Sequence, residues 1–168
     1  MENSVPLSDK VTIKASDLRG ILEYVPLYRG QTFVVAVDGS VIACDNFANV
    51  ITDIAVLRSL GINVVVVHGI GKQLRDIGAE RGVALSDIYG ENPVDDATLS
   101  LAREVSATAL QTIIDAFATK NIRCVSTNAV RATEVGIISG VDHLNAGRIE
   151  KIDFNALQSL ISLGMIPV

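Results

Sequence analysis

The chain has 168 residues, of which 49% are hydrophobic and 20% charged, and it contains no tryptophan. A chain of this length and composition can bury a substantial core, which excludes the disordered and collagen-like classes. Its formal net charge of -5, from 19 acidic against 14 basic residues, leaves no positive surplus to neutralise phosphates, so we expect no nucleic-acid binding.

The N-terminal segment, residues 1–29, is predicted to be an arm followed by a short helix. Residues 1–14 are polar and irregular, and Ser16 fits the N-cap of an amphipathic helix that continues to Tyr28. The arm has no apolar h-region, and it carries acidic residues that transit peptides usually lack. No apolar run approaches the ~20 residues that cross a bilayer. We therefore expect a cytoplasmic protein without membrane contact.

Residues 30–168 are predicted to form a larger α/β unit. The run 32–37 (TFVVAV) is β-branched without polar alternation, which is typical of a central strand covered on both faces. A turn at 38–40 breaks this strand, and the apolar spacing of residues 46–60 predicts a helix that Gly61 stops.

A second strand and helix repeat this arrangement. Residues 62–67 (INVVVV) form another buried-strand pattern, residues 68–71 turn the chain, and 72–81 is helical up to Gly82. A strand, a helix and a further strand make a βαβ unit, whose right-handed crossover generates a parallel sheet with helices on its faces. We expect a three-layer αβα fold with a mainly parallel sheet.

A long helix follows a looser stretch at 84–93. It is predicted over residues 95–119, and Asp95 or Asp96 is placed to favour its positive N-terminus. Residues 121–126 (NIRCVS) should then form a third parallel strand.

The last part of the chain changes character. Residues 130–139 and 148–152 predict an antiparallel hairpin beside the sheet. Asp153 should cap a helix over 154–163. Residues 165–168 (MIPV) read as the start of another buried strand with nothing covering its edge, so we expect the domain to be truncated there.

Two glycine-containing turns follow the first two buried strands. Ligands bind outside the carboxyl ends of strands in open parallel sheets, and a following helix offers free N–H groups to an anion. Equally, glycine is common in such turns because it tolerates positive φ. The candidate ligand-binding residues, for an anion or an amino acid, are Asp38, Gly39, Ser40, His68, Gly69, Ile70 and Gly71.

No catalytic residue or metal site is predicted. Cys44 and Cys124 lie 80 residues apart without a CxxC spacing or a His cluster, so we expect two reduced, packed thiols. His68 has no adjacent carboxylate to orient it, and a structural histidine is its more frequent role.

The second turn and its flanks, INVVVVHGIGKQL, resemble the amino acid kinase superfamily, whose acetylglutamate kinases carry an HGGG turn at this point. Here Ile70 replaces the middle glycine. In the kinases a lysine ends the first strand, whereas this chain has Ala36, followed by Asp38 in place of a glycine. Such a lysine stabilises charge on a transferring phosphoryl group. The resemblance therefore implies a domain without kinase chemistry.

Two longer blocks are similar to N-acetylglutamate synthases. They are LYRGQTFVVAVDGSVIACDNFANVITDIAVLRSLGINVVVVHG and ATEVGIISGVDHLNAGRIEKIDFNALQSLISLGMIPV. The resemblance implies an amino acid kinase-like (carbamate kinase-like) fold, of which residues 30–168 are the N-terminal part. Between the blocks, residues 89–95 lack the arginine that grips a substrate carboxylate in the kinases.

The resemblance implies part of a synthase-like protein of arginine biosynthesis that is itself non-catalytic. In the parent, acetyl-CoA would acetylate glutamate in a separate domain, so no cofactor is expected in this chain. Glutamate, N-acetylglutamate or arginine are the implied ligands, and a homo-oligomer the implied assembly. Two alternatives remain open: a stand-alone inactive sensor or assembly module, and an acetylglutamate kinase.

Overall fold

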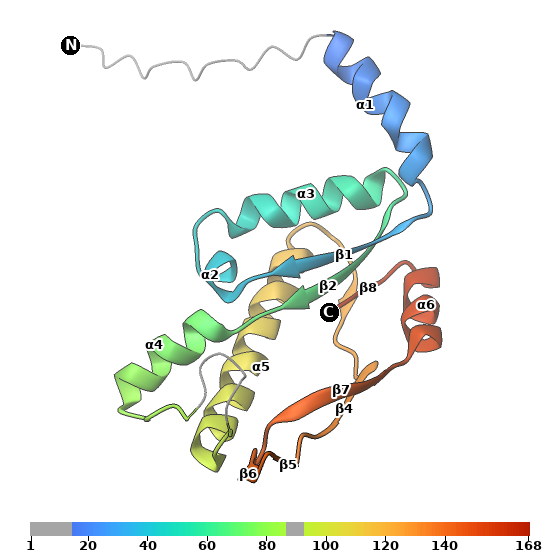
Figure 1. Ribbon diagram of the computed structural model, residues 1–168. Helices are drawn as coiled ribbons and strands as arrows, with labels where there is room; N and C mark the ends of the chain where they lie inside the picture. Colours follow the sequence, from blue (N-terminus) through green and yellow to red (C-terminus); the bar gives the residue numbers. More distant parts are fainter. Residues whose placement is uncertain (1–14, 87–92) are drawn as a thin grey trace, which may run out of the picture.

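The computed structural model describes residues 15–86 and 93–168, so the predicted N-terminal arm lies outside the described residues. The predicted order of helices and strands is confirmed (Figure 1). The helix expected from Ser16 already begins at Ala15. The elements are α1 Ala15–Tyr28, β1 Thr32–Val37, α2 Gly39–Ile42, α3 Phe47–Ser59, β2 Asn63–His68, α4 Gly71–Arg81, α5 Asp96–Ala118, β3 Cys124–Val125, β4 Val130–Glu134, β5 Ile137–Ile138, β6 Val141–Asp142, β7 Gly147–Ile152, α6 Phe154–Ser162 and β8 Ile166–Pro167.

The sheet consists of two parallel strand pairs. β1 pairs with β2 in a register that runs from Thr32 opposite Asn63 to Val37 opposite His68. β3 pairs with β8, and β8 lies beside β2. The third predicted strand is therefore shorter than expected and pairs with the last strand of the chain. The expectation that this last strand has an uncovered edge is wrong, because β8 is paired and its Ile166 is fully buried.

The main core lies between one face of the sheet and the helices α3 and α5. Alternate residues of a strand point to the same face, and Val35 and Val37 of β1 point into this core. Ile54 of α3 and Phe117 of α5 meet them there. Phe117 is completely buried, so this layer is closed to water.

The other face of β1 and β2 is only partly covered. α6 lies over β8, away from β1, as Figure 1 shows. Val34 of β1 is 67% exposed and Val67 of β2 is 53% exposed. The prediction that both strands are covered on both faces is therefore wrong for this half of the sheet. An unbroken apolar run cannot distinguish a core on each side from a core on one side and a cavity on the other.

The predicted hairpin is confirmed and extends away from the parallel strands. β4 pairs antiparallel with β7, from Val130 opposite Ile152 to Glu134 opposite Gly147. β5 and β6 continue the hairpin to its tip. At its base, Asp153 caps α6 as predicted, because its Oδ1 accepts a 3.0 Å hydrogen bond from the N–H of Ala156.

The start of α5 is fixed by a small polar network. Asp95 is its N-cap, and the Asp95 Oδ1 accepts a 2.7 Å hydrogen bond from the N–H of Thr98. The N–H of Asp95 donates to the hydroxyl of Ser86 at 2.9 Å, and that hydroxyl donates to the hydroxyl of Thr98 at 3.1 Å.

Within the described residues, no helix is long and apolar enough to span a bilayer.

Acid should weaken this cap. Hydrogen bonds from Thr98 hold the pKa of the Asp95 carboxyl below its ordinary value of 3.8. A carboxyl with a depressed folded pKa stabilises the fold above 3.8 and loses that contribution as the pH falls through the folded value. Asparagine caps helices without titrating. We expect the advantage of wild type over Asp95→Asn, measured by urea unfolding, to shrink between neutral pH and about pH 3.

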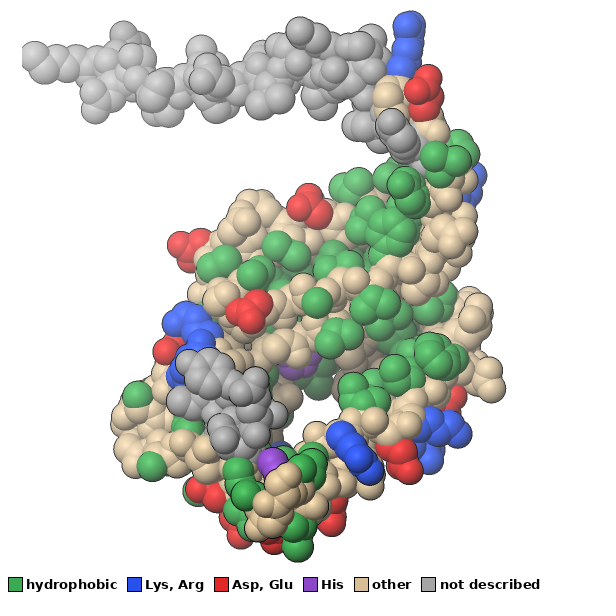
Figure 2. Space-filling view, in the orientation of Figure 1, with side chains coloured by type: hydrophobic (Ala, Val, Ile, Leu, Met, Phe, Trp, Pro, Cys, Tyr) green, Lys and Arg blue, Asp and Glu red, His purple; other side chains and the backbone are tan. Residues whose placement is uncertain are grey.

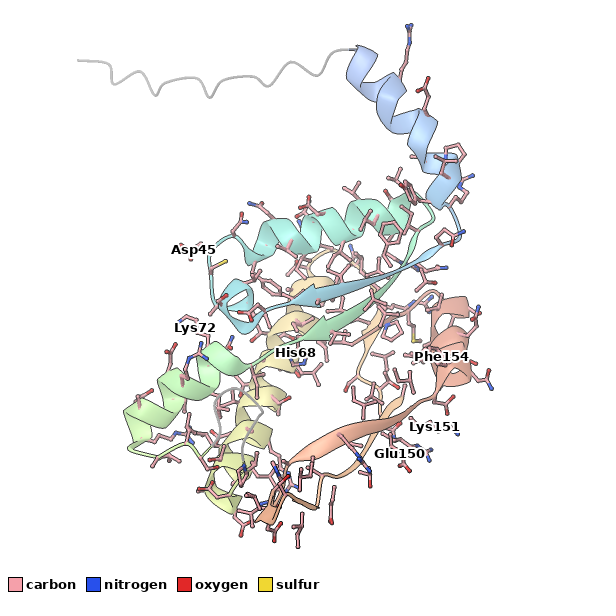
Figure 3. The ribbon with its side chains drawn as sticks, in the orientation of Figure 1. Asp45, His68, Lys72, Glu150, Lys151 and Phe154 are labelled. Atoms are coloured by element: carbon pink, nitrogen blue, oxygen red, sulfur yellow. The ribbon has the colours of Figure 1, made fainter. Side chains whose placement is uncertain are left out.

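The matched control is Asp45→Asn, which removes an exposed carboxyl (Figure 3). Its difference from wild type should change less over the same pH range. An equal change in both variants would mean that the Asp95 cap does not carry the effect.

Candidate ligand-binding site

The two predicted turns meet at the carboxyl ends of β1 and β2. The register places Val37 opposite His68, so both turns begin at the same level of the sheet. The N–H of Gly69 donates to the carbonyl of Val37 at 2.9 Å. A Cβ built on Gly39 would lie 3.1 Å from the carbonyl oxygen of Gly69. The seven predicted residues, 38–40 and 68–71, therefore lie next to one another at the ends of β1 and β2. We call these seven residues the glycine lip.

Gly39 is buried at the point of closest approach within the lip. The side-chain Nε2 of Gln73 donates a 2.7 Å hydrogen bond to the carbonyl of Gly39. A Cβ on Gly39 would collide with Gln73 Oε1. The Gln73 Oε1 is itself buried and has no hydrogen-bond partner in the described structure. Glycine is thus required here by lack of space, since Gly39 does not have a positive φ.

Asp38 and Ser40 form a local cap. Asp38 is the N-cap of the short helix α2, and its Oδ1 accepts from the hydroxyl of Ser40 at 2.6 Å and from the N–H of Ser40 at 2.8 Å. These hydrogen bonds, the hydroxyl contributing most, hold the pKa of the Asp38 carboxyl below its usual value. The lip therefore carries a fixed negative charge at neutral pH.

The second half of the lip begins α4. Ile70 occupies the N-cap position and supplies no side-chain cap. Its side chain instead packs against both hydrophobic clusters of the protein, which explains how an isoleucine is accommodated in a glycine-rich turn. Lys72 pairs with Asp76 at 2.6 Å. Arg75 bends back, so that its Nη1 lies 3.5 Å from the position of a Cβ on Gly71.

His68 connects the glycine lip to a cavity of about 570 Å³. Figure 2 shows the hollow between the sheet and the hairpin, and Figure 3 shows His68 on its sheet side. The Nδ1 of His68 is buried and makes no hydrogen bond within the described residues. Most of the other lining residues are apolar; they include Val34, Val65, Val67, Val130, Ile152, Phe154, Leu157 and Ile161.

The tip of the hairpin is fastened to the start of α5, beyond the cavity. Asn145 Nδ2 donates to the carbonyl of Val94 at 3.1 Å and to Asp96 Oδ1 at 2.8 Å. The backbones add hydrogen bonds from Asn145 N to the carbonyl of Val94, and from Val94 N to the carbonyl of His143. Since every residue of β7 is exposed, the hairpin is a strap held mainly at its two ends.

Three features of this region were not predicted from the sequence: Gln73, Asn145 and the apolar cavity. The one available sequence signal for Gln73 was that it is a polar residue at the start of the helix that follows a glycine-containing turn. Nothing local identified Asn145, whose partners lie about 50 residues away in the chain. Cys44 and Cys124 are both free thiols, but Cys44 is exposed, so the expectation of a packed thiol is wrong at that position. Burial raises the pKa of the Cys124 thiol, and the described residues contain no cluster of potential metal ligands.

Comparisons with known proteins match most of the chain. The model of the amino acid kinase family matches residues 31–168. An amino-acid acetyltransferase of Vibrio cholerae is 35% identical over 152 residues, which cover 85% of this chain and 34% of the relative. One from Photorhabdus laumondii is 33% identical over 172 residues, covering 95% of this chain and 38% of the relative. The chain therefore spans little more than a third of the length of these curated relatives.

Solved structures are also similar to this chain over most of its length. The N-acetylglutamate synthase from Neisseria gonorrhoeae, complexed with coenzyme A and N-acetyl-glutamate, superposes with a TM-score of 0.82 at 28% identity. The match covers 93% of this chain and 37% of that one. A complex of the same synthase with coenzyme A and L-arginine gives a TM-score of 0.79 at 26% identity, with 93% and 39% covered. The similarity confirms the predicted amino acid kinase-like fold.

Gly39→Ala should destabilise the protein by roughly 1 to 3 kcal/mol, because the new methyl overpacks the lip. The free energy of unfolding in urea measures this. Gly20→Ala is the control, since a Cβ on Gly20 meets no atom within 4 Å. Combining Gly39→Ala with Gln73→Ala should recover part of the loss. No recovery would mean that the clash is with the backbone of Gly69 instead.

Asn145→Ala should loosen the strap without unfolding the protein. It removes two hydrogen bonds at the tip, each contributing about 1 kcal/mol. Hydrogen exchange of the β4 and β7 amides should accelerate, while that of α5 remains slow. Asn49→Ala is the control, because it removes one exposed asparagine bond, to Asn46, far from the hairpin. Equal acceleration in both variants would argue against a tip-held strap.

Proposed function

The chain belongs to the amino acid kinase family, and from that premise we propose that it is the amino acid kinase-like part of an N-acetylglutamate synthase. In this proposal the chain transfers no phosphoryl group, and its glycine lip binds an amino acid. The observation that carries the proposal is the chemistry of the lip, which suits a zwitterion better than a phosphate.

Phosphoryl transfer depends on positive charge placed against the transferring group. Near the end of β1 the chain has Ala36, which is uncharged, and Asp38, whose carboxylate is held ionised by Ser40. Lys72, the first cation of α4, is paired with Asp76. A nucleotide phosphate approaching the lip would thus meet a fixed negative charge that opposes it.

An amino acid carries a carboxylate and an ammonium group, and the lip offers a partner for each. The N-terminus of α4 has no side-chain cap and lies beside the guanidinium of Arg75; free N–H groups and a positive helix end favour a carboxylate. The carboxylate of Asp38 would attract the ammonium group. Glutamate, N-acetylglutamate and arginine are the candidate ligands.

The cavity beside the lip would hold the rest of the ligand. Its walls are largely apolar and enclose about 570 Å³, a size and character typical of small-molecule sites. His68 lines this cavity, and its buried Nδ1 makes no hydrogen bond within the described residues. A hydrogen bond from the ligand to this nitrogen would fix the ligand's orientation. Val130 and Ile152, at the base of the strap, line the far side of the same space.

A longer parent would transfer the acetyl group of acetyl-CoA to glutamate, outside the residues of this chain, and would act in the cytoplasm. Assembly into a homo-oligomer is supported by large apolar side chains left exposed, such as Leu27 at 65% and Phe154 at 71%.

Isothermal titration of the chain with L-glutamate, N-acetylglutamate and L-arginine tests the ligand proposal. At least one should bind saturably, and His68→Ala should weaken it about tenfold, the value of one hydrogen bond. His143→Ala is the matched control, because the chain has only these two histidines. It should bind with unchanged affinity.

Flat titrations with all three compounds would contradict amino-acid binding at the lip. A separate assay with ATP and N-acetylglutamate tests the absence of kinase activity. Formation of ADP and an acyl phosphate would overturn that part of the proposal and favour an acetylglutamate kinase.

A further inference from the structure

A second pocket lies at the amino ends of the strands, opposite the glycine lip. It encloses about 350 Å³ between the end of α3, the segment that leads into β3 and the turn before β8. Three of its eight lining residues are cationic and none is acidic. We call Arg58, Lys120 and Arg123 the basic cluster. Because the whole protein has a net charge of -5, this local excess of positive charge is unexpected.

Two members of the cluster converge on one point. A Cβ built on Gly164 would lie 3.4 Å from Arg123 Nη2 and 3.8 Å from Arg58 Nη2. Neither guanidinium group forms an ion pair with a carboxylate. The ion pairs within the described residues are those of Lys72 and Arg81. Like charges placed this close repel one another. An anion at this position would relieve the repulsion.

Hydrogen bonds hold the two arginines in place. Arg58 Nη1 donates to Asn63 Oδ1 at 3.1 Å, and its Nη2 donates to the carbonyl of Gly164 at 3.2 Å. Arg123 Nη2 donates to the carbonyl of Leu163 at 2.8 Å. Each guanidinium has five N–H donors, so these bonds leave most of them available. The two arginines are therefore ordered before any ligand arrives.

Helix ends offset only part of the charge. α3 ends at Ser59, α5 at Ala118 and α6 at Ser162, and all three ends lie near the pocket. A helix C-terminus carries about half a negative elementary charge. Three ends supply about one and a half negative charges, against the three positive charges of the cluster. The pocket remains positive after this compensation.

We propose that the basic cluster binds a small, multiply charged oxyanion. Arginine pairs with phosphate and carboxylate in a bidentate geometry, and lysine adds a mobile point charge. The pocket volume fits a small molecule rather than a polymer. Phosphate and carboxylate groups share this chemistry, so the ligand class includes organic phosphates and polycarboxylates. The site is separate from the amino-acid site proposed at the lip.

Titration with pyrophosphate and with citrate, at an ionic strength held constant with NaCl, tests the proposal. We expect saturable binding of at least one probe, with amide NMR shifts at Asn121 and Ile122. Lys120→Gln should weaken binding about fivefold, as expected for an exposed charge. Lys120 is exposed and makes no side-chain hydrogen bond within the described residues, so this variant should fold normally.

Lys151→Gln is the matched control, since it removes an exposed lysine from the hairpin (Figure 3). Its affinity for the probe should equal that of wild type. Preference for pyrophosphate would identify a phosphate ligand, preference for citrate a carboxylate ligand, and equal binding the shared chemistry. Absence of saturable binding, or equal affinity in wild type and Lys120→Gln, would overturn the proposal.

Discussion

The parallel register between β1 and β2 is the constraint on which the rest of the site depends. Because Val37 lies opposite His68, the chain leaves both strands at the same level, and Gly39 meets Gly69 without an intervening side chain. Gln73 can then reach the carbonyl of Gly39, which fixes the start of α4. A shift of one residue would turn the buried valines of the strands toward the cavity and separate the two turns.

The two ends of the sheet carry opposite electrostatic characters, and helix direction explains why. At the carboxyl ends of β1 and β2, α4 begins, and its positive terminus faces a lip that holds Asp38. At the amino ends, α3, α5 and α6 finish, and Arg58 and Arg123 gather around their negative termini. At the amino ends of the strands, charged side chains therefore complement the helix dipoles. The same helix directions place the proposed amino-acid site and the proposed oxyanion site at opposite ends of the sheet.

Much of the fold could be predicted because local patterns are strong here. Apolar spacing located α3, Asp95 and Asp153 marked the starts of α5 and α6, and Gly82 ended α4. The predictions failed where contacts between distant parts of the chain determine the structure. Apolar runs did not reveal that Val34 and Val67 face a cavity, and β8 pairs with β3 through residues that are 42 positions apart in the chain. Of the candidate site, the seven lip residues could be named, whereas Gln73 and Asn145 could not.

The strap has a consequence for the order in which the protein folds. Its tip contacts α5 through Asn145 and Asp96, which are separated by 49 residues in the chain. Closing a loop of that length has an entropic cost that local turns avoid, and few buried side chains offset it, since β7 is exposed along its length. Contacts of this kind form late and open first. We therefore expect the strap to dock after the sheet and α5 have formed, and to open to solvent more readily than they do.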